Sequence, residues 1–128
     1  MKTERRLLGD FGEKAAARYL KKQRLRILAR NYICGRHEID LIAENAEFLV
    51  FAEVKTRTYN EASMDRFGGA ASAVNYKKQQ NIVAAAKNYL LNYKKQRRVR
   101  FDVIEVYVSP ENPKKIHGIH HMADAFRP

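Results

Sequence analysis

The chain reads His37-Glu38-Ile39-Asp40-Leu41-Ile42 and then, after a short turn, Val50-Phe51-Ala52-Glu53-Val54-Lys55. Both segments are apolar enough to form buried strands, yet acids and a lysine interrupt them. A buried charge is costly unless it is paired or bound to a metal ion. These two segments therefore predict a pair of neighbouring strands that carries a site.

The expected geometry follows from strand pairing. Side chains two residues apart on a strand share a face, so Glu53 and Lys55 point the same way. A tight turn on Asn45-Ala46 would set Asp40 opposite Phe51. Asp40 and Glu53 would then be diagonal neighbours on one face, about 7 to 8 Å apart between alpha carbons. A three-residue loop would reverse this parity, and Asn-Ala is a weak turn sequence, so the predicted register is conditional.

The residue types at this site indicate a class of chemistry. Carboxylate oxygens without thiolates or clustered histidines suit Mg²⁺ or Mn²⁺, and Asp40 and Glu53 are the predicted metal ligands. Lys55 could position an attacking water or offset negative charge on a phosphoryl group, which suits phosphodiester hydrolysis. The alternative is an ion pair of Asp40, Glu53 and Lys55 at a strand end, with Glu38 at the surface.

Four motifs stand out along the chain: Gly9-Asp10-Phe11-Gly12-Glu13-Lys14-Ala15-Ala16, Ala29-Arg30-Asn31-Tyr32, Glu38-Ile39-Asp40-Leu41-Ile42-Ala43 and Phe51-Ala52-Glu53-Val54-Lys55-Thr56-Arg57. Together they resemble the YraN-like family, small bacterial proteins assigned as endonucleases without a proven activity. The later Phe67-Gly68, Ala73-Val74 and Lys77-Lys78 fit the same pattern. The order of the acids is also similar to archaeal Holliday junction resolvases and to the restriction-endonuclease-like nucleases.

The resemblance implies a magnesium-dependent nuclease core that acts on DNA, including branched or other non-standard forms. In it Asp40 and Glu53 bind metal, Lys55 assists the water, and Glu13 contributes from the first helix. The wider fold also includes proteins that lost catalysis and kept nucleic-acid binding, which is the alternative function. His37 departs from the family pattern, which usually has glycine there, and the departure bears on the local turn geometry.

Length and charge set the class of protein. A chain of 128 residues suits one domain, residues 1–128. The excess of 25 Lys and Arg over 14 Asp and Glu gives a net charge of +11, which favours a polyanion, with DNA as the leading partner. No membrane-spanning run or secretory signal is evident, and Cys34 is the single cysteine, so we expect a cytoplasmic protein without a membrane partner.

The apolar periodicity predicts an α/β fold: a restriction-endonuclease-like mixed β-sheet flanked by helices, in the order α-β-β-β-α-β(-β). The first three strands should form an antiparallel meander, and a long loop should cover residues 57–74. Phe126 should hold the terminus on the core. The expected helices are Thr3–Gln23 and Asn75–Tyr93, and the expected strands are Arg26–Ile33, His37–Ala43, Glu47–Thr56, Arg98–Ser109 and Lys114–His120.

The first helix should bury Leu8, Phe11, Ala15 and Tyr19 on one face. Glu13 would then project beside Ala16, close to the buried side, where an edge ion pair is the alternative. Small residues, among them Gly9, Gly12 and Ala16, should let this helix approach the sheet closely.

Basic residues outside the acidic site are the predicted DNA contacts, with ordinary solvation as the alternative. They are Arg57, Lys77, Lys78, Lys94, Lys95, Arg97 and Arg98. On the second helix, similar nucleases use a glutamine to orient water, and both Gln79 and Gln80 are candidates.

Two further readings complete the sequence-based expectations. A metal site of His117, His120 and His121 is weakly indicated, because no acid or thiol pair accompanies them. A homodimer, or an interaction module built on the Ala84-Ala85-Ala86 helix or an edge strand, is the third functional alternative.

Overall fold

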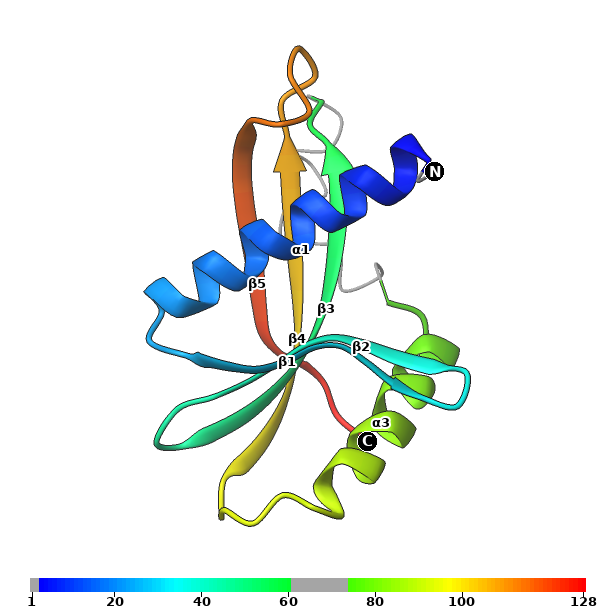
Figure 1. Ribbon diagram of the computed structural model, residues 1–128, viewed down its shortest axis with the longest axis vertical. Helices are drawn as coiled ribbons and strands as arrows, with labels where there is room; N and C mark the ends of the chain where they lie inside the picture. The colour runs from blue at the N-terminus through cyan, green and yellow to red at the C-terminus, as the bar shows by residue number, and fades with distance from the viewer. Residues whose placement is uncertain (1–2, 61–73) are drawn as a thin grey trace.

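The computed structural model of the protein describes residues 3–60 and 74–128, and these residues form an α/β fold (Figure 1). The order α-β-β-β-α-β-β confirms the predicted fold class. Some sequence-predicted features, including Phe67-Gly68 and most of the long loop, lie outside the described residues. The elements are α1 (Glu4–Lys22), β1 (Arg26–Cys34), β2 (His37–Glu44), β3 (Phe48–Thr58), α3 (Tyr76–Leu90), β4 (Arg98–Val108) and β5 (Ile116–Phe126).

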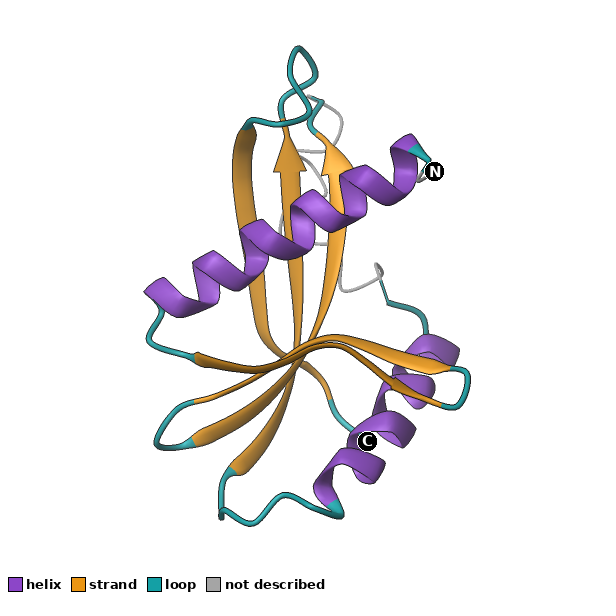
Figure 2. Cartoon of the chain, viewed as in Figure 1, coloured by secondary structure: helices purple, strands orange, loops and turns teal. Residues whose placement is uncertain are grey.

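The described strands form one mixed sheet in the order β1-β2-β3-β4-β5. Strands β1, β2 and β3 are the expected antiparallel meander, and β5 is antiparallel to β4. Strand β4 is parallel to β3 because α3 connects them as a crossover. Helix α1 packs on one face of the sheet and α3 on the other (Figure 2), an arrangement consistent with a nuclease-like fold.

Side-chain caps define where both helices begin. The Thr3 hydroxyl accepts the Arg6 N–H at 3.1 Å, and the Asn75 side chain accepts the Lys78 N–H at 2.8 Å. Helix α3 ends at Leu90, three residues earlier than predicted. The residues that follow close tighter turns of the i to i+3 type, which do not continue an α-helix.

The predicted turn between β2 and β3 is wrong by one residue. It lies on Ala46-Glu47 and not on Asn45-Ala46, because the Asn45 N–H donates to the Phe48 carbonyl at 3.0 Å. The Asn45 side chain also accepts the N–H groups of Glu47 and Phe48, at 2.9 and 2.7 Å. An asparagine that bonds to the backbone ahead of it fixes the turn more strongly than its Asn-Ala context suggests.

The corrected turn changes the register of the hairpin. Phe51 lies opposite Ile42, and not opposite Asp40 as predicted. The shift leaves the parity of the pairing unchanged, because the turn still contains two residues. Asp40 and Glu53 therefore still share a face of the sheet.

Strand β5 is longer than predicted and reaches Phe126, where the sequence suggested an end near His120. Phe126 pairs with Phe101 of β4, and their rings stack with centroids 5.2 Å apart. This contact confirms that Phe126 holds the terminal segment on the core.

The buried face of α1 is centred on Gly12, Ala16 and Leu20, so the predicted stripe is rotated. Leu8 and Phe11 are only half-buried. A β-carbon added at Gly12 would lie 1.7 Å from the Thr56 hydroxyl oxygen of β3, so only glycine permits this approach. The close approach brings Glu13, the next residue, to the edge of the helix-sheet interface.

Replacing Gly12 by alanine is expected to lower the free energy of unfolding by about 1 to 3 kcal/mol, because helix and strand must separate. Gly9→Ala is the matched control on the same helix, since a β-carbon there meets nothing within 4 Å. It should raise stability by about 0.5 to 1 kcal/mol through helix propensity. Urea denaturation of both variants measures the difference, and equal stabilisation by both would contradict the tight contact.

Neither α1 nor α3 is long and apolar enough to cross a membrane, a finding that covers residues 3–60 and 74–128.

Candidate active site

The centre of the candidate site is a carboxyl pair from adjacent strands. The Asp40 carboxylate of β2 accepts the Val54 N–H of β3 at 2.8 Å, which holds it beside Glu53. Glu53 is 5% exposed, and its Oε2 atom has no hydrogen-bond partner among the described residues. The Lys78 ammonium lies 3.7 Å from that oxygen. The two predicted metal ligands are thus together, and one of them carries a buried oxygen directed at a cation.

Burial, the negative charge of Asp40 and a hydrogen bond with its carboxyl group together raise the pKa of Glu53 to about 8, and burial has the largest effect. The nearby charges of Lys78 and Lys55 act oppositely and lower it. The Glu53 carboxyl group is therefore largely protonated at neutral pH in the absence of a bound cation. A divalent ion would replace that proton and both lysines would remain at the rim.

Glu13 of helix α1 lies close enough to Asp40 for their charges to interact, and its role in the site stays a prediction. Burial, as the largest cause, and the negative charges of Asp40, Glu38 and Asp10 together raise the pKa of Glu13 to about 7. A carboxyl group with a pKa near 7 can both give and take a proton at physiological pH. The predicted edge position is correct, but the surroundings of Glu13 are mainly acidic and not a simple ion pair.

Asn31 of β1 connects two of these acids and was not singled out from the sequence. With its amide nitrogen turned toward them, it donates to Glu13 at 2.8 Å and to Glu38 at 2.9 Å. Its φ of 50° is in the left-handed region that asparagine tolerates better than most residues. The available sign of a role for Asn31 was a polar residue inside a predicted strand.

Of the lysines and glutamines that the sequence singled out, some lie at the site and others at the protein surface. Lys55 is half-buried on the Glu53 face of β3, and Lys78 borders the site although it was predicted as an external contact. Lys77 and Gln80 are exposed. Gln79 donates its side-chain amide to the Val74 carbonyl at 2.9 Å, so it supports the start of α3.

Arg57 continues the face of Glu53 and Lys55 along β3, where it meets a buried acid of β4. Its guanidinium lies 3.6 Å from Glu105, which is fully buried and also accepts the Tyr107 hydroxyl at 3.2 Å. The sequence analysis gave Glu105 no role. Glu105 holds Arg57 beside the site and limits its freedom to follow a phosphate.

The basic run between α3 and β4 does not border the acidic site. Lys95 donates to Glu44 at 2.7 Å, Arg97 donates to the Asn45 carbonyl at 2.8 Å, and Arg98 pairs with Glu47 at 3.8 Å. Lys94 is exposed. These contacts tie the segment to the β2–β3 turn, at the opposite end of α3 from Lys78.

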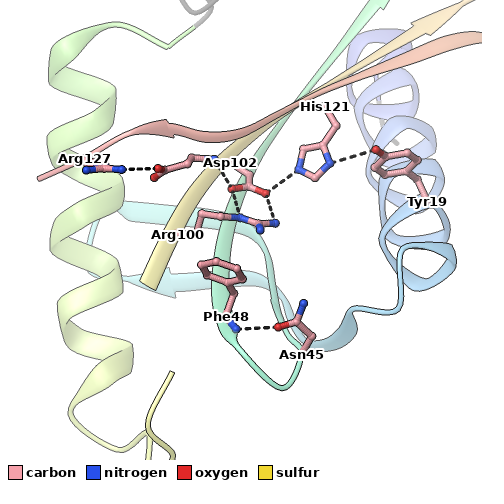
Figure 3. A network of polar contacts seen from close by, with 8 residues as sticks. Tyr19, Asn45, Phe48, Arg100, Asp102, His121 and Arg127 are labelled. Carbon is pink, nitrogen blue, oxygen red and sulfur yellow. Dashed lines mark hydrogen bonds and ion pairs between the residues drawn. The ribbon is translucent and has the colours of Figure 1, made fainter. Parts of the chain in front are cut away.

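The three histidines of β5 do not converge on a metal position. His121 lies between the Tyr19 hydroxyl, at 3.1 Å, and the buried Asp102, at 2.6 Å (Figure 3). Arg100 also donates two bonds of 2.9 Å to Asp102, so this network attaches α1 and β5 to β4. His117 instead stacks on Tyr59, with ring centroids 3.5 Å apart.

Within the described ranges, no three His, Cys, Asp or Glu side chains already form a metal-binding group. The oxygen donors of Asp40 and Glu53 nevertheless fit a hard divalent cation, because one of the oxygens is buried without a partner. Metal binding by this pair stays a prediction.

The fold and site define a class of α/β proteins in which a carboxyl pair and lysines meet on a mixed sheet beside an N-terminal helix. The chain belongs to the uncharacterised protein family UPF0102, whose sequence model matches residues 12–106. The matched region extends from Gly12 to Val106 and thus contains Glu13, Asp40, Glu53 and Lys55. The resemblance to nucleases stays a prediction.

Relatives of this family match nearly the whole chain. A UPF0102 protein of Caldanaerobacter subterraneus subsp. tengcongensis is 42% identical over 98% of this chain and 98% of its own. One of Chlorobium phaeobacteroides is 40% identical over 99% of this chain and 98% of its own. One of Clostridium acetobutylicum is 44% identical over 81% and 82%. The names of these three relatives state no activity.

Proposed function

We propose that the protein is a divalent-metal-dependent endonuclease that hydrolyses phosphodiester bonds in DNA. The observation that carries this proposal is the buried Glu53 oxygen without a hydrogen-bond partner, next to the Asp40 carboxylate and 3.7 Å from the Lys78 ammonium. A carboxyl pair of this kind is unfavourable unless a cation or a proton neutralises it. The net charge of +11 supports a polyanionic substrate.

Each residue has a role that its position supports. Asp40 and Glu53 would hold Mg²⁺ or Mn²⁺, which when bound supplies Lewis-acid polarisation of the scissile phosphate. Lys55, on the same face of β3, orients the attacking water and offsets charge that develops on the phosphoryl oxygens. Glu13 accepts or gives a proton at neutral pH, and Lys78 attracts the phosphate backbone.

A cleavage screen tests this proposal. The purified protein is incubated with Mg²⁺ or Mn²⁺ and end-labelled duplex, nicked, single-stranded and four-way branched DNA. We expect metal-dependent products with at least one of these forms, and a chelator should abolish them. If no form is cut with either ion, the enzymatic proposal fails.

The second candidate is a nucleic-acid-binding protein that keeps this scaffold without catalysis. It is favoured by the net charge of +11, which attracts a polyanion whether or not the carboxyl pair binds a metal ion. Titration calorimetry with Mg²⁺, with and without DNA, separates the two functions. Salt-sensitive DNA binding without measurable metal binding would support this candidate over the enzyme.

A further inference from the structure

A second concave surface lies between the last turn of α3 and strands β1 and β2, away from the candidate active site. It encloses about 530 Å³, and three tyrosines form much of its lining. They are Tyr32 of β1, Tyr89 of α3 and Tyr93, which follows α3. We call this surface the tyrosine pocket.

The tyrosine rings are held in fixed orientations. Tyr32 and Tyr89 pack edge to face, with centroids 5.3 Å apart, and Tyr93 lies 6.1 Å from Tyr89. The Tyr32 hydroxyl accepts the Asn88 amide at 2.6 Å, and the Tyr93 hydroxyl donates to Glu44 at 2.7 Å. Because both hydroxyls are bonded, the rings lose little freedom when a flat ligand packs against them.

The pocket has a positive charge balance. Glu44 is 5% exposed and accepts bonds from Lys95, Tyr93 and Arg26, and these bonds hold its pKa at about 2 despite burial. The lining of the tyrosine pocket contains three cations, Arg26, Lys94 and Lys95, and Glu44 is its one carboxylate. The Arg26 side chain is 67% exposed and that of Lys95 46%, so their charge reaches a ligand in the pocket.

This combination selects one class of ligand. Aromatic faces stack with nucleobases irrespective of sequence, and cations beside them attract phosphate. Asn92, also in the lining, offers an amide for the edge of a base. A purely apolar ligand would cover the charged groups around Glu44 without replacing their water. A base paired inside a duplex cannot enter, because its faces are already stacked.

We propose that the tyrosine pocket binds an unpaired nucleotide of a single strand, with the base against the tyrosine rings and a phosphate near Lys94 and Arg26. This inference rests on the proposed function, since the strand would also pass the candidate active site. Helix α3, with 15 residues, extends from Lys78 beside the candidate active site to Tyr89 in the tyrosine pocket. Its length of about 22 Å corresponds to about six nucleotides at the spacing of a stacked strand.

Photo-crosslinking tests the position of the base. A single strand of about 12 thymidines, twice the length needed to follow α3, carries one 5-iododeoxyuridine and is irradiated with the full-length protein without divalent ions. Mass spectrometry should find the adduct on Tyr32, Tyr89 or Tyr93. Adducts confined to other residues, such as the exposed Tyr76 at the start of α3, would overturn the proposal.

Binding measurements test the phosphate and strand contacts. The variant Asn92→Ala/Lys94→Ala should bind the single strand about fivefold more weakly or worse, with the slope of log affinity against log salt smaller by about 0.7. Its affinity for duplex DNA should change less than twofold. Lys114→Ala, which removes an exposed lysine before β5, is the control and should change neither affinity.

The other outcomes each overturn the inference. Equal losses for single strand and duplex would indicate a general electrostatic contact, and an unchanged affinity for the single strand would exclude the pocket. Thymidine monophosphate bound as tightly as the strand would show a free-nucleotide site instead. All these measurements omit divalent metal, so a protein that fails to cut DNA can still confirm the pocket, and a nuclease can fail this test.

Discussion

Asp40→Asn is expected to lower metal-dependent cleavage by at least about 100-fold, a loss of about 2.7 kcal/mol of transition-state stabilisation. The amide keeps the shape of the side chain and can still accept the Val54 N–H through its oxygen. It removes the negative charge that would attract the cation. DNA binding without metal should change little, because the variant removes no positive charge. Initial rates on the best substrate, at saturating Mg²⁺, measure the effect.

Asp124→Asn provides the matched control for this variant. Asp124 is a partly exposed carboxylate of β5 that pairs with Arg127 at 2.7 Å, and β4 separates its strand from β3 and the carboxyl pair. Its replacement should leave the cleavage rate within about twofold. A rate unaffected by Asp40→Asn would place the reacting centre elsewhere on the molecule.

Glu53→Gln is expected to stabilise the metal-free protein at alkaline pH while it removes activity. Because the folded-state pKa of Glu53 is raised to about 8, the folded chain binds more protons than the unfolded chain between pH 4.5 and 8. The free energy of unfolding of the wild type therefore falls as the pH rises through this range. The neutral amide avoids that loss, which is on the order of 5 kcal/mol at pH 9.

Thermal or urea unfolding at pH 5, 7 and 9 tests whether the free energy of unfolding of the wild type falls as the pH rises. The wild type and Glu53→Gln should be similar at pH 5, and the difference between them should grow as the pH rises to about 8 and then level off. Added Mg²⁺ should restore the wild type at pH 9 and leave the variant unchanged, since only the carboxylate gains from the cation. Glu47→Gln, at an exposed carboxylate of the turn, is the control, and its stability should follow that of the wild type at all three pH values. If the stability of Glu53→Gln also follows that of the wild type, the raised pKa of Glu53 is contradicted.

The expected gain in stability and loss of activity in Glu53→Gln show a conflict between stability and function at Glu53. A buried carboxyl group with one oxygen that lacks a hydrogen-bond partner destabilises a fold, and selection for stability alone would favour an amide or an apolar side chain there. Glu53 is the buried residue with the clearest conflict of this kind in the described part of the chain. This conflict is an independent reason to assign it a functional role.

Local pattern was sufficient to predict the sheet and the shared face of Asp40 and Glu53. Strand side chains alternate with a period of two, so the face depends only on the parity of the turn. The exact register required the Asn45 side-chain bonds, which the turn residues did not reveal. An error of one residue therefore changed the partner of Phe51 without separating the acids.

The remaining parts of the site depend on contacts distant in sequence. Lys78 reaches Glu53 only because α3 packs on that face of the sheet, and a basic residue in a first helical turn gives no sign of this. Glu105 is buried beside Arg57 because β4 pairs parallel to β3. Asn31 reaches Glu13 because Gly12 lets α1 approach closely. The residue pattern within one segment does not predict these contacts between segments that are distant in sequence.

The parallel pairing of β3 with β4 also has a consequence during synthesis of the chain. Each residue of β3 pairs with one 50 positions later, Phe48 with Arg98 through Thr58 with Val108. At about 5 to 20 residues per second, the ribosome needs about 3 to 10 s to add that length. Throughout that interval β3, later the central strand of the sheet, is an edge open to other nascent chains. Yield in cells should therefore depend on chaperones that shield this edge.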